Sequence, residues 1–381
     1  MARVFTDASS TPALDPDHRP EPRVWLLMGD KLGDNAQIQR IAAALGWPCE
    51  TRRVLPRAEY VLGKPRHRAS LEHLDPARSD TLSPPWPELL LTVGRRPSMA
   101  ALWVRQQSGG HTRVVILGRP RRRPGDYALI IAPGQYRLPR MANVLPIHLP
   151  LMACDPAAVA SASGRWEAEL GALPRPLTAV LVGGPTKPYV LDAGVARQLL
   201  RRVEASCPGG TLYISTSRRT PEAVVTALAE ALPARARLFR WTPDGPDNPY
   251  LALLGLADRL VVSGDSISML VEAIRLGRTP MIFPLPARHP GRHRQFRRLV
   301  DALHPAADTH HAPLAPLARA LLHLGVDTGT RDIDGFHELL FRQRLAVPLG
   351  ALAPEPAPVV ADELDTVVAR IRALWSGAAP P

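Results

Sequence analysis

The sequence has little lysine, few cysteines and few aromatic residues, and it has no long apolar run. Only 3 of its 47 basic residues are lysines, so arginine carries nearly all of the positive charge. The 3 cysteines are far apart and have no Cys-x-x-Cys spacing, which predicts neither a disulfide framework nor a zinc site. No apolar stretch approaches the roughly 18 residues that a membrane-spanning helix needs, so we expect no transmembrane segment.

The composition is that of a folded protein with a basic surface. The 381 residues are 45% hydrophobic and 22% charged, which is enough for two globular domains of ordinary size. A formal charge of +12 attracts the phosphates of nucleotides, anionic lipids or nucleic acid without choosing among them. Residues 1–22 are polar, rich in proline and partly acidic, so we expect a mobile tail, no signal peptide and a cytoplasmic location.

One unit of strand, loop, helix and strand organises the second half of the chain. The run from Leu260 to Val262 is typical of a buried parallel strand, and apolar residues at helical spacing predict a helix that begins near Ser266 and ends at Gly277. Residues 281–283 form the next predicted strand.

Polar side chains gather between the strand and the helix of this unit, where backbone N–H groups and the helix dipole favour a phosphate. We predict that the phosphate contacts come from Ser263, Asp265, Ser266 and Ser268. Glu272 lies one to two turns into the helix, within reach of a sugar hydroxyl. The plainer interpretation is an ordinary capped helix with Glu272 exposed to solvent.

Two earlier units of the second half repeat this pattern. Strands predicted at 177–182 and 211–215 are each followed by small or basic residues, and Lys187 is one of the chain's few lysines. The carboxyl ends of parallel strands share one edge of a sheet, so we expect these loops to converge and to surround the domain's main pocket. The candidate binding residues in them are Gly183, Gly184, Thr186, Lys187, Ser215, Thr216, Ser217, Arg218 and Arg219.

The first half has similar loops after its strands. Gly29 and Gly33 permit a tight turn after a strand at 24–28, and Asp34 or Asn35 can cap the helix that follows, predicted from about residue 35 to 45. A strand at 89–93 precedes a loop that carries two arginines and a helix predicted over 99–106. Arg95 and Arg96 thus lie where an anionic ligand would be met, although solvated arginines are the simpler alternative.

These patterns predict an α/β protein with two Rossmann-like domains that face each other across a cleft. We expect an N-terminal domain over residues 23–150, a linker over 151–176 and a C-terminal domain over 177–345. Residues 346–381 are then a linker and a helix that packs back on the domain boundary. The basic turn at 118–124 is a solvated loop or a surface that faces lipid phosphates.

The run from Ser263 to Glu272, followed by Gly277-Arg-Thr-Pro280, resembles the donor-nucleotide unit of GT-B glycosyltransferases. These include the transferase that adds N-acetylglucosamine to the peptidoglycan lipid precursor. The resemblance implies that the helix amino end faces a diphosphate and that Glu272 takes the ribose hydroxyls.

Several motifs together resemble the mitochondrial-fission ELM-type family, over about residues 24 to 304. Its bacterial members resemble predicted nucleotide-sugar glycosyltransferases. The matching motifs are Gly29-Asp-Lys-Leu-Gly-Asp-Asn-Ala-Gln37, Gly94-Arg-Arg96, Val182-Gly-Gly-Pro-Thr-Lys187, Thr216-Ser-Arg-Arg-Thr-Pro221, Asn248-Pro-Tyr250 and Asp265-Ser-Ile-Ser-Met-Leu-Val-Glu272.

The leading interpretation is therefore a transferase that takes a sugar from a nucleotide-diphosphate sugar without a metal ion or other cofactor. Asp30 or Asp34 is the candidate base for an acceptor hydroxyl. The candidate acceptor or phosphate contacts are Gly29, Gly33, Asn35, Arg95, Arg96 and Gln295.

Two alternatives stay open beside this interpretation. One is a non-catalytic adaptor of the same fold at a membrane surface, with peripheral contact to anionic lipids at the inner membrane. The other is a nucleotide-sugar epimerase, for which His289 and His293 are the nearby histidines. No partner among nucleic acids is expected.

Overall fold

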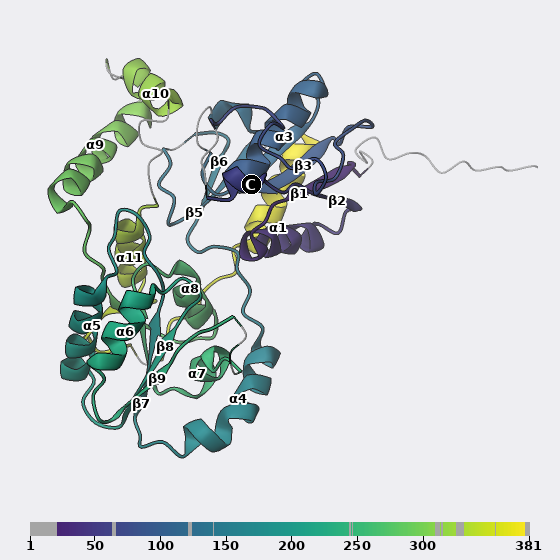
Figure 1. Cartoon of the computed structure of the whole chain (residues 1–381). Helices are drawn as coiled ribbons and strands as arrows, with labels where there is room; N and C mark the ends of the chain where they lie inside the picture. The colour runs from purple at the N-terminus through teal and green to yellow at the C-terminus, as the bar shows by residue number, and fades with distance from the viewer. Residues whose placement is uncertain are drawn as a thin grey trace, which may run out of the picture.

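The computed structural model describes residues 21–62, 66–120, 124–139, 141–243, 245, 247–308, 313, 315–324, 331–354 and 356–377. The predicted tail at 1–22 lies almost wholly outside these residues, and so do residues 121–123 of the basic turn. Figure 1 shows two α/β bodies, one above the other, joined by segments that run between them.

The first body is a parallel sheet with the strand order β2-β1-β3-β4-β5-β6. Its strands are β1 (Val24–Met28), β2 (Cys49–Arg53), β3 (Leu89–Val93), β4 (Arg113–Leu117), β5 (Leu129–Pro133) and β6 (Val144–Ile147). The chain leaves β1 for β2 on one side and then crosses to β3 on the other. The order reverses between β1 and β3, which is where open α/β sheets bind their ligands.

The second body is a parallel sheet with the order β12-β11-β10-β7-β8-β9. Its strands are β7 (Leu177–Val182), β8 (Thr211–Thr216), β9 (Ala236–Phe239), β10 (Arg259–Ser263), β11 (Met281–Phe283) and β12 (Val347–Pro348). Here the order reverses between β7 and β10, so the loops after these two strands lie side by side at the carboxyl edge.

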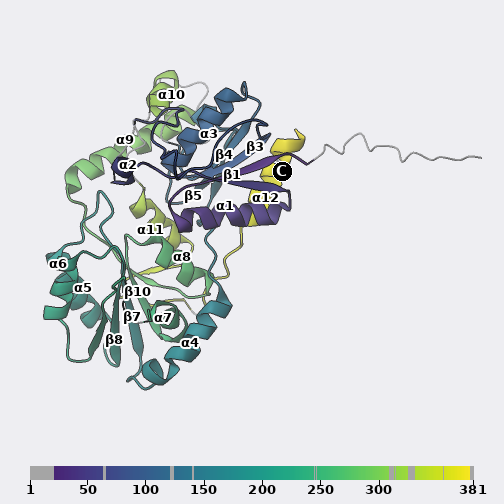
Figure 2. The same ribbon diagram turned by 45° about the vertical axis from the view of Figure 1, so that its right-hand side comes forward.

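Helices cover the sheets and connect them. Those of the first body are α1 (Leu32–Leu45), α2 (Ala58–Leu62), α3 (Arg95–Gln107) and the short 3-10 helix η1 (Pro124–Asp126). Along the rest of the chain follow α4 (Pro156–Gly171), α5 (Ala193–Ser206), α6 (Glu222–Glu230), α7 (Tyr250–Leu256), α8 (Ile267–Arg275), α9 (Pro290–Asp308), α10 (Ala315–Leu324), α11 (Ile333–Arg342) and α12 (Leu364–Ser376). Both views in Figures 1 and 2 show α8 and α11 at the end of the second sheet that faces the first body.

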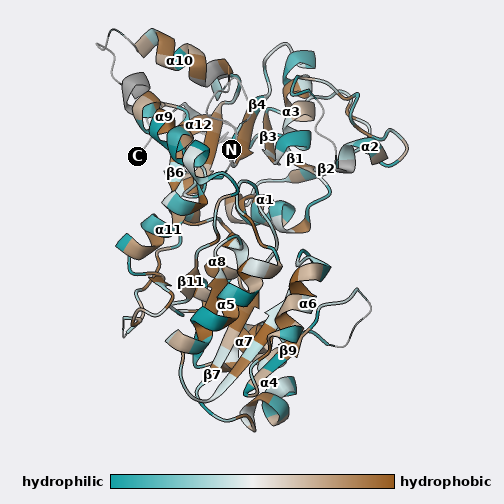
Figure 3. Ribbon diagram, turned by 60° about the vertical axis from the view of Figure 1, so that its left-hand side comes forward, coloured by the Kyte–Doolittle hydropathy of each residue, from teal (hydrophilic) through white to brown (hydrophobic). Residues whose placement is uncertain are grey.

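Alternating burial explains how each strand serves two faces of its sheet. In β1, Val24 and Leu26 belong to one hydrophobic cluster, whereas Trp25 and Leu27 belong to another on the opposite face. Figure 3 shows these strands as hydrophobic ribbons, and the outer helix α5 as more hydrophilic. The α/β class with two Rossmann-like domains is therefore confirmed.

The C-terminal helix returns to the first body. Val367 and Ile371 of α12 are fully buried in the cluster that contains β1, β3 and α1. Arg372 donates a hydrogen bond to the carbonyl oxygen of Leu45 at 2.9 Å. None of the described helices combines the length and the apolar character that crossing a bilayer requires.

Candidate functional site

The loops after β7 and β10 are bonded to each other at the point where the strand order reverses. The N–H of Gly183 donates to Ser263 Oγ at 2.8 Å, and the N–H of Gly184 donates to Asp265 Oδ2 at 2.8 Å. A Cβ at Gly183 would lie 2.3 Å from Asp265 Oδ2, and one at Gly184 would lie 2.3 Å from the carbonyl oxygen of Arg219. The two glycines thus allow these loops to approach each other closely.

Asp265 joins these loops from a fully buried position. Its other oxygen, Oδ1, accepts a hydrogen bond from Ser263 Oγ at 2.7 Å, and Arg219 Nη2 lies 3.4 Å from Oδ2. Burial raises the pKa of this carboxyl, while the bonds from Ser263 and Gly184 and the charge of Arg219 oppose the rise. Because these partners occupy both oxygens, Asp265 and Ser263 brace the loops.

The loop after β8 joins the same cluster. Arg219 also donates to Thr186 Oγ1 at 3.3 Å, so one guanidinium spans the loops after β7 and β10. Thr220 donates to the carbonyl oxygen of Gly183 at 2.6 Å, and the N-cap position of α6 is Pro221. The three loops therefore converge as the sequence predicted, through side chains whose partners it did not identify.

Other hydroxyl groups at the end of β8 also bond to neighbouring parts of the chain. Thr216 Oγ1 donates to the carbonyl oxygen of Phe239 and accepts from the N–H of Trp241, while Ser217 Oγ lies 3.1 Å from Thr220 Oγ1. Ser215 is buried as well. Thr216 therefore holds the end of β8 to the end of β9 and the chain after it, and the buried side chains of Ser215 and Thr216 are closed to a ligand, whereas Ser217 is half-buried.

The amino end of α8 is the part of the predicted site whose backbone N–H groups do not hold the loops together. Ser266 occupies the N-cap position, as predicted, but its side chain makes no capping hydrogen bond. The first N–H groups of a helix have no partner inside it, and those of Ile267 to Met269 add to the positive end of the helix dipole. Ser266 is buried and Ser268 is half-buried beside them.

Glu272 is half-buried on the same helix, so a simple exposed position is excluded. Tyr250 of α7 donates its hydroxyl proton to Glu272 Oε2 at 2.5 Å. Burial raises the pKa of Glu272, and the bond from Tyr250 opposes the rise. The second carboxylate oxygen takes no hydrogen bond from any described residue and can accept one from a ligand.

Two cations of the predicted set are exposed beside these loops. Lys187 and Arg218 make no hydrogen bond or ion pair within the described part of the chain. Both are long enough to follow an anionic ligand, and they are the free positive charges that the bracing leaves.

In the first body, the loop after β1 is closed by Asn35. Its side chain accepts from the N–H of Gly29 at 3.2 Å and donates to the carbonyl oxygen of Gly29 at 2.9 Å. Asn35 therefore lies inside α1, which begins three residues earlier than predicted, and neither it nor Asp34 caps the helix. A Cβ at Gly29 would meet Pro97 at 2.8 Å, whereas Gly33 has open space around it.

Two of the predicted residues of this body are paired with each other. Asp30 Oδ2 accepts a hydrogen bond from Arg96 Nη1 at 2.9 Å. Helix α3 begins at Arg95, so both arginines lie in its first turn and not in a preceding loop. Asp34 is half-buried and adds to the charge that raises the pKa of Arg331, behind the contribution of Tyr136.

Helix α11 is the element that the sequence pattern did not reveal. Its His337 shares a hydrogen bond with the carbonyl oxygen of Gly264 at 2.9 Å, and burial lowers the pKa of this imidazole. The N–H of Asp332, just before the helix, donates to the carbonyl oxygen of Gln135 in the first body at 3.0 Å. The start of α11 thus touches both bodies, and no motif at 331–337 signalled this.

Two histidines considered for the epimerase alternative differ in setting. Nε2 of His293 lies 3.0 Å from Asp334 Oδ2 and 3.5 Å from the Tyr189 hydroxyl. His289 is exposed, and so is the predicted contact residue Gln295. The structure thus brings a histidine, a carboxylate and a tyrosine together beside the loop after β7.

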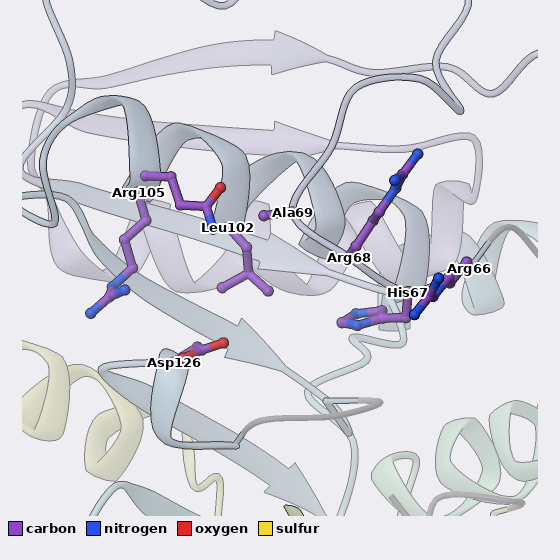
Figure 4. A pocket seen from close by; sticks show the side chains of 8 residues that line it. Arg66, His67, Arg68, Ala69, Leu102, Arg105 and Asp126 are labelled. Carbon is purple, nitrogen blue, oxygen red and sulfur yellow. The ribbon is translucent and has the colours of Figure 1, made fainter. Parts of the chain in front are cut away.

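Two cavities lie away from the predicted residues. One of about 1010 Å³ lies at the amino ends of β7, β10 and β11, opposite the predicted loops. One of about 560 Å³ lies in the first body between Arg105 of α3 and Asp126 of η1 (Figure 4). Among the described residues, no three His, Cys, Asp or Glu side chains gather as a metal ion would require.

The match to known sequences extends over most of these elements. A family model described as Mitochondrial fission ELM1 matches residues 33–315. The chain belongs to this family. The mitochondrial fission protein ELM1 of Arabidopsis thaliana is 28% identical to it over 217 residues, which are 50% of this chain and 50% of the plant protein. The match therefore spans about half the length of this curated relative.

A second relative of this ELM1 family member is an uncharacterized protein of Rickettsia prowazekii (strain Madrid E). It is 22% identical over 317 residues, covering 73% of this chain and 88% of that protein. Among solved structures, the chain is similar to a co-structure of S. aureus MnaA with UDP, at 11% identity, a TM-score of 0.46 and coverage of 93% and 96%. MurG of Acinetobacter baumannii is similar at 12% identity and a TM-score of 0.38, with coverage of 85% and 100%.

Proposed function

We propose that this protein is a metal-independent glycosyltransferase that binds a nucleotide-diphosphate sugar at the carboxyl edge of its second sheet. The observation that carries the proposal is the amino end of α8, which lies where the strand order reverses and where the N-cap residue Ser266 makes no side-chain bond to the first N–H groups of the helix. Asp265 and Ser263 hold the neighbouring loops in place beside it. Such an edge offers N–H groups and a positive dipole to a diphosphate.

The residues divide into braces and ligand contacts under this proposal. The diphosphate is met by the first turn of α8, the hydroxyls of Ser266 and Ser268 and the exposed cations Lys187 and Arg218. These groups stabilise the negative charge that develops on the leaving diphosphate as the bond to the sugar breaks. Glu272 accepts hydrogen bonds from the ribose hydroxyls through its oxygen that does not bind Tyr250.

The acceptor enters from the first body. Asp30 is held in place by its hydrogen bond from Arg96. Asp34 lies near Arg331, which comes from the opposite body. Asp30 and Asp34 both stay candidates for the base that deprotonates an acceptor hydroxyl.

One observation favours the epimerase alternative as a second candidate. An epimerase needs a histidine beside carboxylates, and His293 is paired with Asp334 near Lys187's loop. Incubation with uridine-diphosphate N-acetylglucosamine distinguishes the two candidates by NMR. An epimerised sugar still joined to the nucleotide supports the epimerase, whereas released uridine diphosphate, with the sugar joined to water or to an added acceptor hydroxyl, supports the transferase.

Calorimetric titration with uridine, guanosine and thymidine diphosphates tests the proposed site. Glu272→Ala should weaken binding of the ligand that binds by ~1.5–3 kcal/mol, or roughly ten- to over a hundred-fold, because a charged acceptor is lost. Tyr250→Phe is the matched control, since it removes the bond to Glu272 and keeps the carboxylate. Titration in EDTA should give the same affinity. Equal affinities of wild type and Glu272→Ala would remove Glu272 from the site.

A further inference from the structure

Helices α9 and α10 form an arm that lies to the outside of the two sheets (Figures 1 and 3). The arm is defined here as residues 290–308 and 315–324. The two helices pack on each other, and Val300, Ala315 and Ala318 are buried. Apart from His293 and Gln295, the residues of the arm belong to no part of the site described above.

The outward surface of α10 is apolar. Leu317 is 57% exposed and Leu324 is 64% exposed, and their spacing of seven residues places them on one face of the helix. Ala320 is exposed on the same face, between them. On α9, Leu299 adds a third large apolar side chain that is 45% exposed. Such a stripe is unusual on a helix whose partners are all in place.

The exposed side chains of α9 are strongly basic. Arg292, Arg294 and Arg298 are exposed and make no ion pair with an acid in the described part of the chain. The acid Asp301 of this helix is already paired with Arg137 of the first body. Arg297 differs from the other three, because Asp334 and Glu338 of α11 hold it. Within the described part of the chain, no acidic side chain compensates the charges of Arg292, Arg294 and Arg298.

We propose that the arm docks on an anionic phospholipid surface, with Leu317 and Leu324 in the acyl boundary and Arg294 and Arg298 on headgroup phosphates. Exposed leucines together with arginines are the chemistry of helices that lie in a membrane interface. A second copy of this chain is a poor occupant, since both copies carry a formal charge of +12 and repel each other. The proposal is independent of the nucleotide site.

Co-sedimentation of the whole chain with lipid vesicles tests this docking. Wild type should bind vesicles that contain phosphatidylserine, bind phosphatidylcholine vesicles far less, and dissociate as salt is added. Arg294→Gln with Arg298→Gln should lower the partition coefficient about fivefold for each arginine. Leu317→Ser with Leu324→Ser should lower it by at least about tenfold. The matched control is Leu352→Ser, which removes a leucine that is 95% exposed outside the arm.

Circular dichroism and thermal unfolding verify that each variant is folded, and the arginine pair keeps the test valid if the leucine pair misfolds. No binding by wild type would overturn the proposal. Binding that the folded arm variants retain would place the lipid contact elsewhere and overturn it too. Light scattering that shows dimers in wild type and monomers in the leucine pair would assign the stripe to a second copy instead.

Discussion

Among the polar residues of the predicted site, we expect Asp265 to contribute most to the free energy of unfolding. It is fully buried and accepts hydrogen bonds from the Gly184 N–H at 2.8 Å and Ser263 Oγ at 2.7 Å. Replacement by alanine leaves both donors without their acceptor, and each buried unpaired donor costs about 1–3 kcal/mol. Asp265→Ala should therefore lower the free energy of unfolding by roughly 2–6 kcal/mol, a large part of a typical domain's stability.

Asp265→Asn is the informative partner variant, because it keeps the size and one carbonyl oxygen but cannot ionise. The folded-state pKa of Asp265 lies above the ordinary 3.8, so its ionisable carboxyl contributes stability that is present below that value and is lost as the pH rises through the raised pKa. The stability difference between wild type and Asp265→Asn should thus shrink as the pH rises. Guanidinium unfolding across this pH range measures it, and a loss below about 0.5 kcal/mol in Asp265→Ala would refute the brace.

Three further predictions concern other parts of the molecule. Asp258 is half-exposed; burial opposes its ionisation, but the bonds from the Leu177 N–H and Arg175 lower its pKa. Asp258→Asn should therefore lower the melting temperature at neutral pH. This effect should disappear as the pH falls through the folded-state pKa. Equal effects at both ends of the range would contradict this. Ile371→Ala should lower the free energy of unfolding, measured by calorimetry, by about 2–5 kcal/mol, because Ile371 is fully buried between α12 and the first sheet. An unchanged free energy would show that α12 does not stabilise that body. Lysine acetylation can be measured by mass spectrometry with and without uridine diphosphate. The nucleotide should protect Lys187 from acetylation and leave Lys31 reactive. Equal labelling of Lys187 in both samples would remove it from the site.

The strand and loop pattern was sufficient to predict the edge of the sheet where the polar loops meet. Apolar runs such as Leu177–Val182 and Leu89–Val93 coincide with the observed strands, because buried parallel strands need continuous apolar sequence. Loops after such strands share one edge of the sheet, so the convergence of residues 183–187 and 263–268 followed from topology alone.

The sequence could not show which loop residues are free to bind a ligand and which bond to each other. Polar residues after a strand carry the same pattern whether they bind a ligand or each other, and Ser263 and Asp265 bind the glycine N–H groups of a loop 80 residues away. Asn35 is similar, since its bonds to Gly29 are local but its sequence is also that of a helix cap. For Ser263 and Asp265, hydrogen-bond partners distant in sequence decide the role, whereas for Asn35 the choice is between two local bonding patterns.

Helix α11 was missed for a different reason. Its contacts depend on the packing of two bodies, with Asp332 bonded to Gln135 and His337 to Gly264. The residues around it are poor in strand or loop motifs, and the pattern of a partly buried helix says nothing about which surfaces it joins. Arg331, which lies beside this helix and near Asp34, stayed outside the predicted set for the same reason.

We expect a nucleoside diphosphate to bind at the amino end of α8. A crystal structure of the whole chain with uridine diphosphate, or with whichever diphosphate binds in calorimetry, would show where it lies. The diphosphate should contact the N–H groups of Ile267 to Met269, with Lys187 beside it and the ribose hydroxyls on Glu272. A nucleotide bound elsewhere, such as in the cavity at the amino ends of β7 and β10, would contradict this expectation.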